Sequence, residues 1–269
     1  MTGNSTDNFQ GVGGHNGETD FGFRRVAEDD HPSMVQAVFD SVAPRYDLMN
    51  DLMSGGLHRL WKQLLINRLN PSPGMQLIDV AGGTGDIAGR FLARVGEAPA
   101  DGGADTGRVT ICDLNSSMLG VGKARFLDSG IIHGADFICA NAESLPLADG
   151  VADACTIAFG LRNVTRRGKA LGEMRRVLKP GGHFLCLEFS PSVLPSLAPL
   201  YEVYSHKVLP ALGRAITGDG DAYRYLVESI RRFPAPNILA AEMRDAGFGN
   251  VTFQPFSGGI VALHSGWRT

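Results

Sequence analysis

The sequence predicts an α/β fold in which a mostly parallel, seven-stranded sheet is covered by helices on both faces. From Met75 onward, apolar strand-like runs alternate with helical patterns, which is typical of such a sheet. A short turn joins the last two runs, so one strand of this C-terminal hairpin should run antiparallel to the rest. The expected strands cover residues 75–80, 108–113, 136–140, 153–159, 183–189, 251–256 and 259–264.

The segments around these strands divide the chain further. Residues 1–20 are rich in Gly, Asn, Asp and Thr, which predicts a disordered tail. Apolar residues at helical spacing predict an N-terminal helical cap over 32–70. A proline-rich stretch after the fifth strand predicts a helical insertion over about 190–232, followed by a helix over 236–246. We therefore place residues 21–269 in a single domain.

The composition argues against several classes of protein. With 25 Lys+Arg against 28 Asp+Glu, the formal net charge is -3, and no sustained basic stripe favours a nucleic-acid partner. The four cysteines lack metal-ligand spacing, so we expect no metal and interpret them as buried free thiols in a reducing compartment. There is no signal-peptide pattern at the N-terminus and no run of about 18 apolar residues. These features predict a cytoplasmic protein.

The most informative motif is the glycine-rich turn between the first strand and the helix after it. Asp79-Val80-Ala81-Gly82-Gly83-Thr84-Gly85-Asp86 would bring backbone N–H groups and a helix N-terminus to an anionic group. Its alternating spacing is typical of S-adenosylmethionine (SAM) methyltransferases, whereas NAD(P)-dependent oxidoreductases, the alternative, favour G-x-G-x-x-G.

Three further polar residues follow strands whose carboxyl ends should meet at one edge of the sheet. Asp113 could bind ribose hydroxyls or cap a helix. Asn141 could face an adenine edge or form a turn. Arg162 could stabilise negative charge or form a salt bridge.

Five stretches of the chain match one family in the same order. They are Tyr46–Ser54 continuing to Lys62, Asp79–Asp86, Phe159–Val164, Val177–Gly182 and Tyr223–Ile230. Together they resemble the ubiquinone/menaquinone biosynthesis C-methyltransferases, which are class I SAM-dependent enzymes with a Rossmann-like fold. The segments Asp20–Phe23 and Leu263–Gly266 look more like the mitochondrial-type ubiquinone branch. One departure is Ala158, where bacterial relatives commonly have Ser, so no hydroxyl contact to the cofactor can be made there.

The resemblance implies SAM-dependent methylation of a ring carbon in a polyprenylated benzoquinol or naphthoquinol. It matches Thr84, Asp113 and the Asn141-Ala142 pair to cofactor-contacting positions of the family. Combined with the glycine turn, the expected SAM-binding residues are Asp79, Gly83, Thr84, Gly85, Asp113, Asn141 and Ala142. An alternative from another class is a catalytically idle scaffold of a quinone-biosynthesis complex.

For catalysis, we expect Arg162 to stabilise a phenolate, since a guanidinium is a poor proton acceptor. The candidate bases or binders are His58, His206, Glu188 and Tyr201, and His58 leads them because it lies in the family-like N-terminal segment. The prenylated substrate further predicts transient contact with a membrane surface, placing the protein peripherally at the inner membrane. Partnership with other quinone-biosynthesis enzymes and a homodimer are left open.

Overall fold

The computed structural model describes residues 17–43, 46–96, 106–192 and 220–269, and in these the predicted sheet is confirmed. Its strand order is β5-β4-β3-β6-β7-β9-β8. All neighbours pair in parallel except β9, which is antiparallel to both β7 and β8. The strands are β3 Gln76–Val80, β4 Arg108–Asp113, β5 Ala135–Cys139, β6 Ala152–Ala158, β7 Leu178–Phe189, β8 Phe248–Phe256 and β9 Val261–Arg268.

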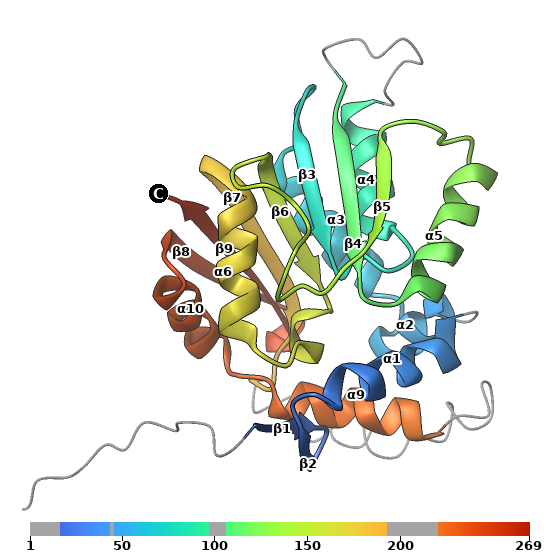
Figure 1. Cartoon of the computed structure of the whole chain (residues 1–269), viewed down its shortest axis with the longest axis vertical. Helices are drawn as coiled ribbons and strands as arrows, with labels where there is room; N and C mark the ends of the chain where they lie inside the picture. The colour runs from blue at the N-terminus through green and yellow to red at the C-terminus, as the bar shows by residue number, and fades with distance from the viewer. Residues whose placement is uncertain (1–16, 44–45, 97–105, 193–219) are drawn as a thin grey trace, which may run out of the picture.

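Helices cover both faces of this sheet (Figure 1). Because successive side chains of a strand point to opposite faces, each strand contributes side chains to two cores, one on each face of the sheet. Leu77 of β3 packs into one core with Phe91 of α4, whereas Ile78 packs into the other with Met174 of α6. The covering helices are α3 His58–Leu69, α4 Asp86–Val95 and α5 Ser116–Asp128 on the first face, and α6 Arg167–Val177 and α10 Pro236–Asp245 on the second.

The predicted helical cap divides into two parts. Helices α1 His31–Val42 and α2 Tyr46–Ser54 lie below the sheet in Figure 1, close to α9 Gly220–Arg232. Helix α3 instead packs on the sheet itself, because Trp61 and Leu65 are fully buried in the first core. The cap that faces the strand ends is therefore formed by the first two helices.

The fold begins slightly before the predicted boundary at Phe21. Strands β1 Glu18–Phe21 and β2 Arg24–Ala27 form a separate antiparallel hairpin. It is fixed to α9 because the Phe21 ring stacks on Tyr225 at 4.3 Å and the Phe23 amide donates to Glu228 at 3.0 Å. Residues 1–16 of the predicted tail and 193–219 of the predicted insertion lie outside the described residues.

The cysteines differ from the prediction at one position. Cys112, Cys155 and Cys186 are buried, as expected, but Cys139 is exposed, because β5 is the edge strand of the sheet. Within the described ranges, no group of three or more His, Cys, Asp or Glu side chains is placed to hold a metal ion.

Candidate functional site

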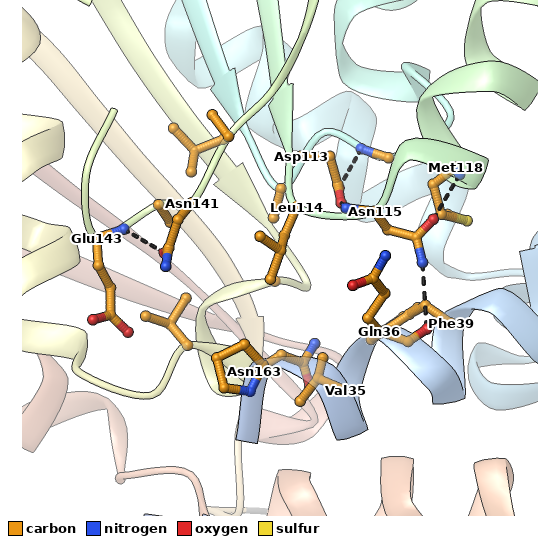
Figure 2. Close-up of a pocket in the computed structure, with 18 of the residues that line it drawn as sticks. Val35, Gln36, Phe39, Asp113, Leu114, Asn115, Met118, Asn141, Glu143 and Asn163 are labelled. Atoms are coloured by element: carbon orange, nitrogen blue, oxygen red, sulfur yellow. Dashed lines mark hydrogen bonds between the residues drawn. The ribbon is translucent and has the colours of Figure 1, made fainter. Parts of the chain in front are cut away.

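A pocket opens where the carboxyl ends of β3, β4, β5 and β6 meet α1, with about 830 Å³ of empty space including its mouth. Parallel α/β sheets bind ligands at this edge. Figure 2 shows Asp113, Asn115 and Asn141 at its polar wall, with Val35, Phe39 and Leu114 completing it.

The glycine turn brings backbone close to this pocket. Ala81, Gly83 and Gly85 have φ of 51°, 54° and 78°, a region that favours glycine. A Cβ on Gly82 would meet the Ile111 side chain at 2.7 Å, so only glycine lets the turn pass beside β4. Helix α4 then begins without a side-chain cap. Its first N–H groups thus remain able to bind an acceptor.

Asp113 joins this turn to the end of β4. Its Oδ2 accepts the Gly83 amide at 2.9 Å and its Oδ1 accepts the Asn115 amide at 2.8 Å (Figure 2). The cap of α5 is Asn115, which accepts from the Met118 amide at 2.9 Å. Burial raises the pKa of Asp113 to about 6. Asp113 is therefore a pocket carboxylate, and the alternative role as helix cap belongs to its neighbour.

Asn141, Ala142 and Glu143 line the pocket after β5. The Asn141 side-chain oxygen accepts the Glu143 amide at 2.9 Å, so this residue does form the turn that its type favours. Glu143 in turn accepts from the Arg166 Nε at 2.8 Å. The turn presents Asn141 and the Ala142 backbone to the pocket.

Three other predicted cofactor residues, Asp79 near the end of β3 and Thr84 and Gly85 in the turn, are not among the residues that line the pocket. Asp79 is 1% exposed; its Oδ1 accepts the Thr156 hydroxyl at 2.7 Å, while its Oδ2 has no hydrogen-bond partner in the part of the chain that the structure describes. Burial raises its pKa to about 7. Thr84 is buried and accepts from Arg125 at 3.3 Å, and Gly85 packs against the Phe126 ring. Their contacts with cofactor stay predictions.

Arg162 lies in the short helix η2 Leu161–Asn163, directly after β6. Its neighbours Gly160 and Asn163 line the pocket, but its guanidinium points to the Glu188 carboxylate at 2.8 Å, with both side chains less than 5% exposed. The guanidinium also donates to the Phe159 carbonyl, and its buried Nε has no hydrogen-bond partner among the described residues. The salt-bridge interpretation is thus correct.

His58 begins α3 and is not among the pocket-lining residues. Its Nε2 contacts Asp51 at 2.9 Å, and burial lowers its pKa. Its role as base stays a prediction. Glu188 is engaged by Arg162, and Tyr201 and His206 lie outside the described residues.

Helix α1 contributes residues to the pocket that no sequence motif had indicated. Val35, Gln36 and Phe39 project from this helix into the pocket, at the spacing of one helical face. The Asn115 side chain fixes the position of this helix, because its Nδ2 donates to the Asp40 carboxylate at 2.8 Å. The helical spacing of these residues was visible in the sequence. The sequence did not indicate that this helix face lies against the pocket at the strand ends.

Comparisons with known proteins agree with this geometry. The sequence model of the ubiE/COQ5 methyltransferase family matches residues 25–268. Proteins called ubiquinone/menaquinone biosynthesis C-methyltransferase UbiE are 56% identical in Nitrobacter hamburgensis and 54% identical in Bradyrhizobium diazoefficiens, each over 93% of this chain and 97% of the relative.

Solved structures show the same fold at low sequence identity. A SAM-dependent methyltransferase from Aquifex aeolicus superposes with a TM-score of 0.57 at 16% identity, covering 83% of this chain and 98% of that one. One from Thermotoga maritima gives 0.59 at 17% identity, covering 87% and 99%. With the family match spanning nearly all of the described residues, the chain belongs to the ubiE/COQ5 methyltransferase family.

Proposed function

We propose that this protein is a SAM-dependent C-methyltransferase that methylates a ring carbon of a polyprenylated quinol in the biosynthesis of ubiquinone, menaquinone or both. The observation that carries the proposal is the pocket at the strand ends, where the Asp113 carboxylate is bonded to the glycine turn, in a chain 56% identical to a UbiE C-methyltransferase. The same family membership argues against an NAD(P)-dependent oxidoreductase.

The residues present suit SAM. The ionised Asp113 carboxylate would accept the ribose hydroxyls, and Asn141 and Ala142 would lie at the adenine, against the apolar side chains of Leu114 and Met118. The unpartnered Oδ2 of Asp79 is a buried acceptor beside the glycine turn, which suits a cationic ligand. Thr84 and Gly85 would act by shaping that turn. When bound, SAM supplies an electrophilic methyl group.

The protein's own task is to make a ring carbon electron-rich and to hold it in line. That carbon becomes nucleophilic when the neighbouring phenol, whose ordinary pKa is near 10, loses its proton. Arg162 would stabilise the phenolate through its free Nε–H, while an ordered water accepts the proton. Glu188 holds the guanidinium in place and keeps the site from carrying an uncompensated positive charge.

The decisive experiment uses purified protein and methyl-labelled SAM. We expect label in the product with a demethylated, prenylated benzoquinol or naphthoquinol. Comparing the label incorporated into these two quinols shows which ring the enzyme methylates. Calorimetric titration should show SAM binding and no NADH binding. Absence of label with both quinols, despite SAM binding, would leave the idle scaffold as the better description.

The prenylated substrate also motivates our proposal of transient contact with the inner membrane. No helix in the described part of the chain is long and apolar enough to cross a bilayer. Leu48, Leu57 and Leu60 of the α2–α3 region are 39%, 41% and 55% exposed, which suits contact with lipid. Cosedimentation with anionic vesicles tests this, and a triple Leu→Ser variant should bind them less. Sedimentation velocity and copurification test the homodimer and the enzyme complex.

A further inference from the structure

A second cavity lies on the far side of α1 from the cofactor pocket. We name it the α1–α9 groove; it has about 1280 Å³ of empty space including its open side. Its apolar and aromatic lining includes Phe21, Met34, Ala37, Val38, Ala222 and Tyr225, and its polar lining residues are Arg24, Ser41, Arg224 and Glu228. Helix α1 is thus shared by two cavities, with Val35 and Phe39 facing the first and Met34, Ala37 and Val38 facing the second.

The groove adjoins the place where we expect the quinol ring. Tyr225 is 5% exposed and forms part of the groove, yet its hydroxyl donates to Asn163 at 3.0 Å. Asn163 lines the cofactor pocket and directly follows Arg162. Burial raises the pKa of the Tyr225 hydroxyl, and the nearby charges of Arg162 and Glu188 shift that pKa in opposite directions. One tyrosine side chain therefore separates the groove from the proposed phenolate site.

The chemistry of the groove changes from its floor to its rim. The floor is the stacked pair Phe21 and Tyr225, whose ring centroids are 4.3 Å apart. Arg24 lies over the Phe21 ring at 5.3 Å, and the 48%-exposed Phe23 contacts Arg232, which is not itself a lining residue, at 5.7 Å. The charged lining residues are Arg24, Arg224 and Glu228, so cations outnumber the one carboxylate. An apolar floor with this excess of cations suits a hydrocarbon chain that leaves the protein toward an anionic lipid surface.

We propose that the α1–α9 groove binds the isoprenoid chain of the methyl acceptor, an inference that rests on the proposed function. The quinol ring lies beside Arg162 and Asn163, and its chain passes Tyr225 along the outer face of α1. Apolar contact in this groove distinguishes long-chain from short-chain acceptors, because each methylene taken out of water strengthens binding about fourfold.

The test fills the groove without touching the cofactor pocket. Ala37 is exposed on α1, so Ala37→Trp places an indole in the groove, and Ala37→Leu adds a smaller side chain. The matched control is Ala93→Trp, at an exposed alanine of α4 outside both cavities. For each variant we would measure kcat/KM with quinols that carry one and four isoprenoid units, and SAM affinity.

We expect Ala37→Trp to lower kcat/KM for the four-unit quinol about tenfold or more, corresponding to two or more lost methylene contacts, while the one-unit quinol and SAM affinity stay near wild type. Ala37→Leu should give a smaller loss of the same kind, and Ala93→Trp none. Equal effects on both quinols, or none, would overturn the proposal. The proposal would also be overturned if Ala37→Trp weakened vesicle binding or changed self-association without changing the chain-length preference. Those results would mean that the groove binds a membrane or a second copy of this chain.

A binding measurement separates this proposal from the proposed function. Equilibrium dialysis of labelled geranylgeraniol against the full chain needs no methyl transfer, and Ala37→Trp should weaken its binding about tenfold relative to Ala93→Trp. A wild-type chain that methylates no quinol overturns the proposed function. Equal binding of geranylgeraniol by the two variants overturns the proposal that the groove binds the isoprenoid chain.

Discussion

Replacing Asp79 by Asn should flatten the pH dependence of stability. The unfolded Asp79 has a pKa near 3.9, whereas burial raises the pKa in the folded protein to about 7. Between these values the folded protein holds a proton that the unfolded chain has released, so stability falls as pH rises through this window. At about 1.4 kcal/mol per pH unit, this carboxyl lowers the free energy of unfolding by about 3 kcal/mol between pH 5 and pH 8.

The assay is urea denaturation of wild type and Asp79→Asn at pH 5 and pH 8. We expect the difference in free energy of unfolding, variant minus wild type, to be about 3 kcal/mol larger at pH 8 than at pH 5. Any pH-independent cost of the amide cancels in this comparison. The contributions of Asp113 and the histidines to the pH dependence also cancel, because the substitution leaves those groups in place. Asp128→Asn, at an exposed position of α5, is the control.

The same variant should lose SAM affinity, because the substituted side chain would present an amide where the wild type offers a buried carboxylate oxygen without a partner. A gain of stability at pH 8 together with weaker SAM binding would mark the charge as functional. Parallel pH profiles for wild type and variant would refute the reasoning, because they would mean that Asp79 titrates alike in the folded and unfolded chains.

Three further predictions concern the same edge of the sheet. Arg162→Ala should lower turnover strongly while SAM affinity, measured by calorimetry, stays near wild type; an equal loss of affinity would assign Arg162 to cofactor binding instead. Glu188→Gln should destabilise the protein by about 3–5 kcal/mol in urea denaturation, because it leaves a buried guanidinium unpaired, and combining it with Arg162→Met should recover part of this loss. SAM affinity should fall as the pH drops through about 7 and then about 6, where Asp79 and Asp113 take up protons, and Asp113→Asn should bind SAM weakly at all pH values.

Local patterns predicted much of the fold. The apolar runs of the strands and the glycine turn that follows Asp79 both depend on residues near in sequence, so the sheet and the cofactor edge could be predicted. The hairpin that contains β9 was predicted from its turn. The strand begins at Val261 and not at residue 259, because residues Ser257–Gly259 form a short 3₁₀ turn before it.

Contacts between distant segments could not be predicted in this way. Arg162 and Glu188 are 26 positions apart, and only the parallel pairing of β6 with β7 brings their side chains together. The β1–β2 hairpin was missed for a similar reason. Its strands are four residues long, with Phe21 as the one buried side chain among them, and the partner of that ring, Tyr225, lies on α9.

The placement of buried charge connects stability to function. Asp79 and Asp113 both have raised pKa values, and Arg162 and Glu188 are buried as a pair, although each of these groups is costly to remove from water. All four follow or lie within the last part of strands at the carboxyl edge, beside the pocket that α1 covers. Well-packed apolar side chains would serve stability better there. We propose that the protein retains these charges for the ligand and the reaction. The gain of stability at pH 8 and the loss of SAM affinity that we expect for Asp79→Asn measure that conflict directly.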